Sequence, residues 1–226
     1  MAVRDQVIAV TGAAGALGAR VVQRLGEAGA RVAALDLAAE IPGEPALALA
    51  GVALDDPEAA MAAMARIEAG FGRLDGLVNI AGGFRWQTLA DGDLATWDLM
   101  YAMNLRSAVA TTQAALPLLR AVRGAIVNVG AAAAVKAGAG FGAYAASKAG
   151  VARLTEALAE ELRGDGVRVN AILPTIIDTP ANRRDMPKAD FSKWVTPDEI
   201  GAAVEFLLSA EASGITGALL PVSGRV

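Results

Sequence analysis

The segment from Val7 to Gly18 constrains the fold of this chain more than any other. Val7-Ile8-Ala9-Val10 is a short, continuously apolar run, and a turn with three glycines separates it from an apolar helical segment. A strand without polar alternation is typical of a parallel sheet covered on both faces. A glycine-rich turn before a helix lets phosphate oxygens approach free backbone N–H groups. The segment therefore predicts the first strand–helix unit of a dinucleotide-binding sheet. Its expected cofactor contacts are Gly12, Ala14, Gly15, Ala16, Leu17 and Gly18.

The rest of the chain repeats this alternation of strand and helix. Further strands are expected at residues 31–35, 48–54, 74–80, 125–129, 167–173 and 218–222, and helices at 16–28, 56–69, 94–119, 144–163 and 197–208. No linker or low-complexity segment interrupts the pattern, so we expect residues 1–226 to form a single domain. The pattern predicts an α/β fold with a doubly wound, mostly parallel sheet of about seven strands and helices on both faces. Ligands of such sheets bind beyond the carboxyl ends of the strands.

Composition excludes several classes of chemistry. The 226 residues include no cysteine and no histidine, which removes thiolate and imidazole nucleophiles, bases and metal ligands. We therefore expect no metal site. The net charge of −4 argues against binding nucleic acid through its phosphates. Neither a signal peptide nor an apolar run long enough to span a membrane is visible, so we expect a cytoplasmic protein without membrane partners.

Tyr144 and Lys148 are the strongest candidates for acid–base chemistry. They lie four residues apart in a helical pattern, so their side chains share one face. A tyrosine with an ordinary pKa of ~10 is a poor acid–base catalyst near neutral pH. A neighbouring ammonium group favours the phenolate, so we expect Lys148 to lower the pKa of Tyr144.

With the glycine-rich turn, Tyr144-x-x-x-Lys148 and Asn79-Ile80-Ala81-Gly82, the chain resembles the short-chain dehydrogenase/reductase family from about Val7 to Pro221. The resemblance implies a Rossmann fold, a nicotinamide cofactor and hydride transfer to or from a small molecule. It implies that Tyr144 is the general acid or base and that Lys148 holds the nicotinamide ribose. Asn104 matches the family's asparagine that kinks a helix and holds a water in a proton relay to the lysine. Ala16 is a mild departure, since the family has glycine there.

Asp36 indicates which cofactor is preferred. It ends the second strand, 18 residues after Gly18, where a carboxylate can accept hydrogen bonds from both adenosine ribose hydroxyls. The same carboxylate would repel a 2′-phosphate, and no Arg or Lys follows it closely. We therefore predict NAD(H) in preference to NADP(H). The resemblance places further cofactor contacts at Leu37, Leu54, Asn79, Ala81, Gly82, Pro174, Ile177 and Thr179. Which residue from Ala53 to Asp55 contacts the adenine stays open.

One family residue is missing. The serine that hydrogen-bonds the substrate oxygen lies about thirteen positions before the tyrosine, where this chain has Ala131. Dihydropteridine reductase, in the same superfamily, also lacks that serine, and residues 173–194 resemble its corresponding loop. The resemblance suggests that residues about 180–196 form a substrate lid and that the substrate could be a quinonoid dihydropterin or similar planar heterocycle. Expected substrate contacts are Ala131, Arg85, Trp86, Asn182 and Trp194.

Two alternatives stay open. The chain could be a carbonyl reductase or secondary alcohol dehydrogenase that works without the serine, or a non-catalytic scaffold that binds the cofactor. The two long helical segments, Leu94 to Leu119 and Tyr144 to Arg163, carry broad alanine-rich faces. Family members pair these helices, so we expect a homodimer or homotetramer.

Overall fold

A single seven-stranded parallel sheet organises the molecule, in the order β3-β2-β1-β4-β5-β6-β7. The computed structural model describes residues 3–225. The strands are β1 (Val7–Thr11), β2 (Arg31–Leu35), β3 (Leu47–Leu49), β4 (Gly76–Asn79), β5 (Ala125–Val129), β6 (Arg168–Pro174) and β7 (Leu219–Val222). The order reverses between β1 and β4, which makes this a doubly wound Rossmann fold. The predicted fold is confirmed.

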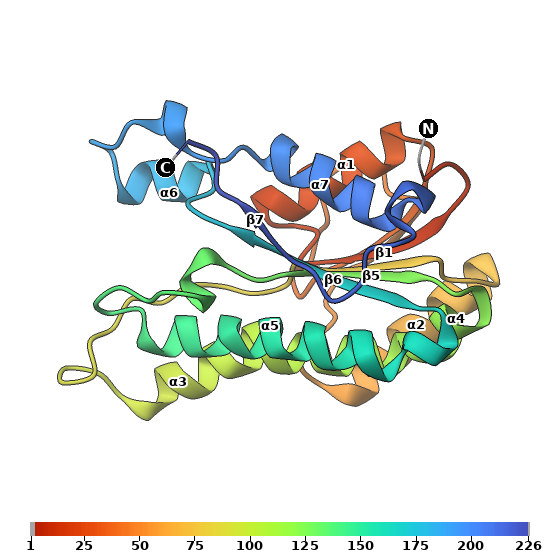
Figure 1. The fold of residues 1–226 in the computed structure, drawn as a ribbon, viewed down its shortest axis with the longest axis horizontal. Coiled ribbons are helices and arrows are strands. Elements are labelled where there is room, and N and C mark those ends of the chain that lie inside the picture. Colours follow the sequence, from red (N-terminus) through yellow and green to blue (C-terminus); the bar gives the residue numbers. More distant parts are fainter. Residues whose placement is uncertain (1–2, 226) are drawn as a thin grey trace.

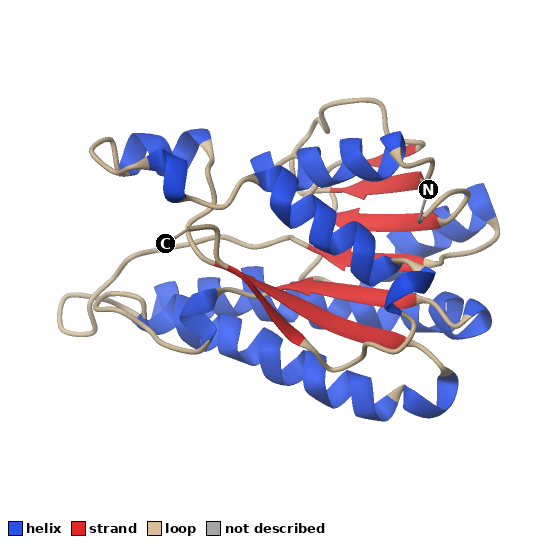
Figure 2. Ribbon diagram, turned by 45° about the horizontal axis from the view of Figure 1, so that its top comes forward, coloured by secondary structure: helices blue, strands red, loops and turns tan. Residues whose placement is uncertain are grey.

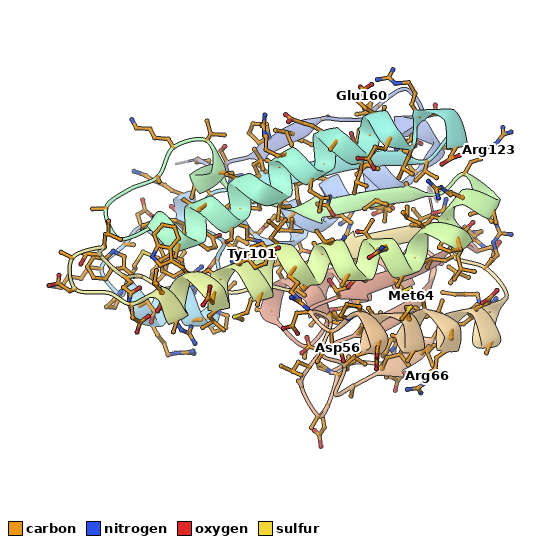
Figure 3. All side chains as sticks on the ribbon, turned by 90° about the horizontal axis from the view of Figure 1, so that it is seen from below. Asp56, Met64, Arg66, Tyr101, Arg123 and Glu160 are labelled. Carbon is orange, nitrogen blue, oxygen red and sulfur yellow. The ribbon has the colours of Figure 1, made fainter. Side chains whose placement is uncertain are left out.

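Helices cover both faces of the sheet (Figure 1). On one face lie α1 (Ala16–Glu27) and α7 (Pro197–Leu208), and on the other lie α2 (Pro57–Phe71), α4 (Ser107–Val122) and α5 (Gly142–Glu161). Each strand therefore has apolar side chains on both sides. Val10 and Val78 belong to the core under α1 and α7, whereas Ala9 and Leu77 belong to the core over α2, α4 and α5. Figure 3 shows the second layer from below, with α2 beginning beside Asp56.

Local sequence fixes several helix ends. The Asp56 side chain accepts a hydrogen bond from the Glu58 N–H and caps α2, as the Asp-Pro-Glu sequence predicts. Thr196 and Glu199 form a capping box at the start of α7. Each cap satisfies backbone groups that a helix end would otherwise leave without partners.

Two elements differ from the prediction. The third strand is shorter than expected, because Gly51 adopts a left-handed backbone conformation (φ +70°) and turns the chain after Leu49. The long helical segment beginning at Leu94 is divided into α3 (Leu94–Tyr101), a π-helical turn (Ala102–Arg106) and α4. A π-turn holds one extra residue, which changes the direction of the side chains that follow.

The short helix α6 (Pro180–Asp185) lies near the carboxyl ends of the strands, beyond β6. The loop that precedes α3 and the loop that precedes α5 reach the same end of the molecule (Figure 1). No helix among residues 3–225 is long and apolar enough to cross a membrane.

Candidate active site

A cleft of about 1230 Å³ lies at the carboxyl ends of the strands, and residues of α6 contribute to its lining. Figure 2 shows the strands of the sheet, in red, between the helices of its two faces. Residues expected to contact a cofactor line it from three directions: Gly12, Gly15, Ala16, Leu17 and Gly18 from the first turn, Asp36, Leu37 and Leu54 from the next two loops, and Ala81, Gly82, Tyr144, Lys148, Pro174, Ile177 and Thr179 around the far end. Single-ligand pockets typically have volumes of ~300–1,000 Å³. The cleft therefore has room for an extended dinucleotide and a small substrate. A smaller hollow of about 720 Å³ lies between α1 and the 42–46 loop, away from Tyr144 and Lys148.

The glycine-rich turn is fixed by close backbone packing. Gly12 has φ +67°, and a Cβ there would lie 2.7 Å from the Ala81 nitrogen. A Cβ on Gly18 would overlap the Gly12 carbonyl and lie 2.9 Å from the Ala13 Cα. Gly15 is the N-cap of α1, and no side chain hydrogen-bonds to this helix N-terminus. These features fit a diphosphate group, which would be held by backbone N–H groups and the helix dipole.

Asp36 lies in the cleft with its carboxylate fixed in place. Its Oδ2 accepts a hydrogen bond from the Ala14 N–H at 2.9 Å, and its Oδ1 accepts one from the Ala38 N–H at 2.8 Å. An ionised carboxylate offers about four acceptor sites, so about two remain for other donors. Among the described cleft residues the cations are Lys148 and Arg184, and neither adjoins Asp36 in the sequence.

Tyr144 and Lys148 occupy adjacent turns of α5 at the inner end of the cleft. The Lys148 side chain is buried, and its Nζ donates a hydrogen bond to the Val129 carbonyl at 2.8 Å. Burial lowers the pKa of Lys148 to about 8. Burial also raises the pKa of Tyr144 to about 12, which corrects the prediction that Lys148 lowers it. In this structure desolvation of the phenolate outweighs any attraction from the ammonium group.

Asn104 lies in the π-turn, and its side-chain amide joins three segments. Oδ1 accepts a hydrogen bond from the Gly83 N–H at 2.8 Å, while Nδ2 donates to the Gly83 carbonyl at 3.1 Å and to Ser147 Oγ at 2.9 Å. Ser147 Oγ in turn donates to the Tyr144 carbonyl at 2.7 Å. The π-turn thus ties the loop after β4 to the first turns of α5. The proton relay through Asn104 stays a prediction.

The position of the missing serine is apolar. Ala131 is buried, lines the cleft and lies two residues after the end of β5. The ring of Phe84 lies across the same end of the cleft, perpendicular to Tyr144, with ring centroids 5.0 Å apart. Phe141 packs against both rings, at 5.0 Å from Phe84 and 6.3 Å from Tyr144. The surroundings of the Tyr144 ring are therefore aromatic and aliphatic.

The structure places six of the expected site residues outside the cleft lining, namely Ala14, Asn79, Arg85, Trp86, Asn104 and Trp194. The Ala14 N–H donates a hydrogen bond to the Asp36 carboxylate. Trp194 is only 4 % exposed, and its ring packs on that of Phe191 within the 180–196 segment. The expected contacts of these six residues with a cofactor or substrate stay predictions.

Arg85 and Trp86 turn away for a local reason. The Trp86 Nε1–H donates a hydrogen bond to the Ala139 carbonyl, and the Gln87 N–H donates one to the Gly140 carbonyl. These bonds hold the 84–87 loop against the 139–141 loop. Phe84, which sequence reasoning missed, consequently faces the cleft in their place. Asn182 lines the cleft as expected, and its Nδ2 donates to the Ile177 carbonyl.

Asn79 belongs to a buried polar network. Its Nδ2 donates hydrogen bonds to Asn128 Oδ1 at 2.8 Å and to Thr112 Oγ1 at 3.0 Å. Asn128 Nδ2 donates to Thr155 Oγ1 at 2.9 Å. The network links β4 and β5 to α4 and α5 beneath the cleft. The alternation of side chains along β4 predicts this placement of Asn79. Val78 faces α1 and α7, so the next residue, Asn79, must face the opposite side of the sheet.

The glycine-rich turn, the Asp36 carboxylate at the end of β2 and the Tyr144–Lys148 pair lie in one cleft, an arrangement typical of a nucleotide-dependent oxidoreductase. The family model described as short chain dehydrogenase matches residues 6–190. The chain belongs to the short-chain dehydrogenase/reductase family and is an oxidoreductase of that family.

Relatives match over nearly the whole chain. D-threitol dehydrogenase of Mycolicibacterium smegmatis is 40 % identical, over 97 % of this chain and 92 % of its own length. The 3-oxoacyl-[acyl-carrier-protein] reductase of Thermotoga maritima is 30 % identical, over 99 % and 98 % of the two chains. Carveol dehydrogenase of Mycobacterium avium, solved in complex with NAD, superposes with a TM-score of 0.87 at 28 % identity, covering 98 % of this chain and 97 % of that one.

Proposed function

We propose that this protein is an NAD(H)-preferring reductase of small carbonyl compounds, and in the reverse direction a dehydrogenase of secondary alcohols. The observation that carries the proposal is the pair of half-buried Tyr144 and buried Lys148 in a cleft that the glycine-rich turn also lines. The relatives named for threitol dehydrogenation and oxoacyl reduction support this reaction class.

Tyr144 is the proton donor for reduction in this proposal. With its pKa raised to about 12 by burial, Tyr144 keeps its proton throughout the neutral range. When bound, the nicotinamide supplies the hydride to the carbonyl carbon. The Tyr144 hydroxyl donates its proton to the carbonyl oxygen, giving the alcohol, and regains a proton from solvent. Lys148, still mostly protonated at pH 7 with a pKa of about 8, would hold a nicotinamide ribose by hydrogen bonds.

The NAD(H) preference rests on Asp36. Its carboxylate retains acceptor capacity for ribose hydroxyls and would repel a 2′-phosphate. Leu37 and Ala38, which follow it in the cleft lining, offer no compensating charge. Residues 180–196, where Asn182 and Arg184 line the cleft, form the substrate lid in this proposal. We also propose that the protein forms a homodimer or homotetramer through α4 and α5, because Val109 is exposed on α4.

A second candidate reaction is the reduction of a quinonoid dihydropterin or similar planar heterocycle. Ala131 favours it, because hydride addition to an electron-poor conjugated ring does not need a serine to polarise an isolated carbonyl. Loss of one preorganised donor of that kind typically costs ~10²–10³ in the rate of carbonyl chemistry. The aromatic surroundings of Tyr144 fit a flat substrate as well.

The test compares the only two tyrosines of the chain. NADH and NADPH oxidation are measured with quinonoid dihydropterin and with a panel of ketones, for the wild type, Tyr144→Phe and Tyr101→Phe. Tyr101 is 52 % exposed on α3 and does not line the cleft (Figure 3), so it is the matched control. We expect Tyr144→Phe to abolish turnover with either substrate class and to leave NADH binding intact. We expect Tyr101→Phe to behave as the wild type.

Each outcome has a distinct meaning. Unchanged turnover in Tyr144→Phe contradicts the assigned role of Tyr144. Preference for NADPH contradicts the role of Asp36. Turnover of the pterin alone supports the second candidate. NADH binding without turnover of any substrate favours a non-catalytic scaffold; a relative 35 % identical carries the name inactive 2-(S)-hydroxypropyl-CoM dehydrogenase 2.

A further inference from the structure

The end of the cleft beside Tyr144 has an aromatic wall, formed by the ring of Phe84 packed against Phe141 and Tyr144. The 84–87 and 139–141 loops determine the position of this wall. Phe84 is 43 % exposed, and the part of its ring not covered by Tyr144 and Phe141 borders the cleft. A half-exposed phenylalanine beside a reactive hydroxyl leaves apolar surface in contact with water, and the ring of a ligand can cover that surface.

The wall is built rigidly. Three ring contacts join Phe84, Phe141 and Tyr144, with centroid distances of 5.0–6.3 Å. Hydrogen bonds from Trp86 and Gln87 to the 139–141 loop fix the segment that carries Phe84. Gly140 permits this close approach, since it has φ +77° and a Cβ there would overlap the Trp86 ring. A preorganised ring loses little conformational freedom when a second ring stacks on it.

The remaining lining beside Phe84 is also apolar. Leu99 and Met103 line the cleft from α3 and the π-turn, and a Cβ on Gly83 would lie 2.7 Å from the Met103 methyl group. Ala131 presents a methyl group where family members present a hydroxyl. Tyr144 thus supplies a proton-donating hydroxyl at an end of the cleft that these apolar side chains line. Such a site suits a substrate with one reacting oxygen and a flat apolar body.

We propose that Phe84 determines substrate specificity by stacking on a planar, unsaturated ring attached to the reacting carbonyl carbon. This inference deepens the proposed function and depends on Tyr144 marking the reacting end. Its substrate class is the aryl or conjugated cyclic ketone and the matching secondary alcohol. The part of the substrate beyond the ring would extend towards α6.

The test measures binding without turnover. Acetophenone and cyclohexyl methyl ketone have the same carbon skeleton, but only the first has a flat ring. Their dissociation constants are measured by ligand-observed NMR on the Tyr144→Phe protein saturated with NADH, alone and combined with Phe84→Leu or Phe84→Ala. Because the Tyr144→Phe background cannot donate the proton, the result is independent of whether the proposed reaction occurs.

Phe84→Leu keeps the apolar volume and removes the aromatic face. We expect acetophenone to bind about tenfold more weakly in this variant, in line with the worth of an aromatic pair, and cyclohexyl methyl ketone to change by less than about twofold. Phe84→Ala should weaken both probes. Leu89→Ala is the matched control, because Leu89 lies on the same loop, is 81 % exposed and does not line the cleft.

Several outcomes would overturn the proposal. If acetophenone binds Phe84→Leu as well as the parent protein, Phe84 does not stack on the ligand. If both probes weaken equally in Phe84→Leu, the wall is apolar without aromatic selectivity. If acetophenone fails to bind the parent protein while NADH binds, the substrate class is wrong. The proposed function fails separately, through retained turnover in the single variant Tyr144→Phe.

Discussion

Replacing Lys148 with methionine should stabilise the protein and remove its activity, because burying the Lys148 ammonium group lowers the free energy of unfolding. Lys148 is 5 % exposed, and burial lowers its pKa from 10.5 to about 8. At about 1.4 kcal/mol per pKa unit, this fall corresponds to a desolvation cost of about 3–4 kcal/mol. Methionine has a similar length and no charge. Part of the gain is offset, since the hydrogen bond to the Val129 carbonyl, worth about 1 kcal/mol, is lost.

The pH dependence gives a second and independent readout. Below pH 8 both the folded and the unfolded protein hold the Lys148 proton, so its contribution to stability is constant. Between pH 8 and 10.5 the folded protein releases the proton while the unfolded chain keeps it, so the free energy of unfolding rises with pH. Tyr144 acts oppositely above pH 10, because the unfolded chain loses a phenol proton that the folded protein retains up to about pH 12.

The assay is urea denaturation at pH 7, 8, 9 and 10, followed by circular dichroism at one protein concentration, for the wild type and Lys148→Met. We expect the variant to be more stable by about 2 kcal/mol at pH 7, and this advantage to shrink towards zero as pH rises to 10. Since Tyr144 is present in both proteins, its titration largely cancels in the difference. A variant less stable than wild type at pH 7, or an advantage that is independent of pH, would refute the reasoning.

The other predictions concern packing beneath the cleft. Gly18→Ala should lower stability and prevent NADH binding, because its Cβ would overlap the Gly12 carbonyl, whereas Gly26→Ala in the same helix meets no atom within 4 Å and should raise stability by about 0.5–1 kcal/mol; thermal denaturation and NADH fluorescence measure both. Asn128→Leu should cost about 2–5 kcal/mol in urea denaturation, because Asn79 and Thr155 each lose a buried partner. An Asn128→Leu protein as stable as the wild type would show that the network contributes little.

The fold and the cofactor half of the site follow from local sequence because their signals are local. Val7–Val10 is apolar at every position since both faces of β1 are covered, and that pattern needs no knowledge of the neighbours. Gly18 is fixed by contacts inside one turn, whereas Gly12 is fixed by its left-handed φ of +67° and by the close approach of Ala81 after β4. Asp36 lies in the cleft because every parallel strand ends at the same edge of the sheet.

Burial explains where the pKa prediction went wrong. Helical spacing correctly places Tyr144 and Lys148 on one face of α5. Spacing carries no information on how much solvent each group loses, and that loss decides both pKa values here. The Lys148 ammonium lies under the end of β5, where the Val129 carbonyl accepts its hydrogen bond. The hydrogen-bond partner of the ammonium group is therefore a strand residue 19 positions earlier in the chain, which helical spacing does not reveal.

The substrate half of the site depends on contacts between loops, which explains why Phe84 was missed. Arg85 and Trp86 have the residue types expected of a stacking surface, and Phe84 is their immediate neighbour. What selects Phe84 is the hydrogen bond from Trp86 to Ala139, a residue 53 positions away, which turns the indole outwards. Trp86 thus contributes to the site by holding the loop that presents Phe84. On the proposal that Phe84 selects the substrate, the 139–141 loop contributes to specificity as much as the residues that line the cleft, and substitutions at Gly140 should alter substrate choice without touching the cofactor half.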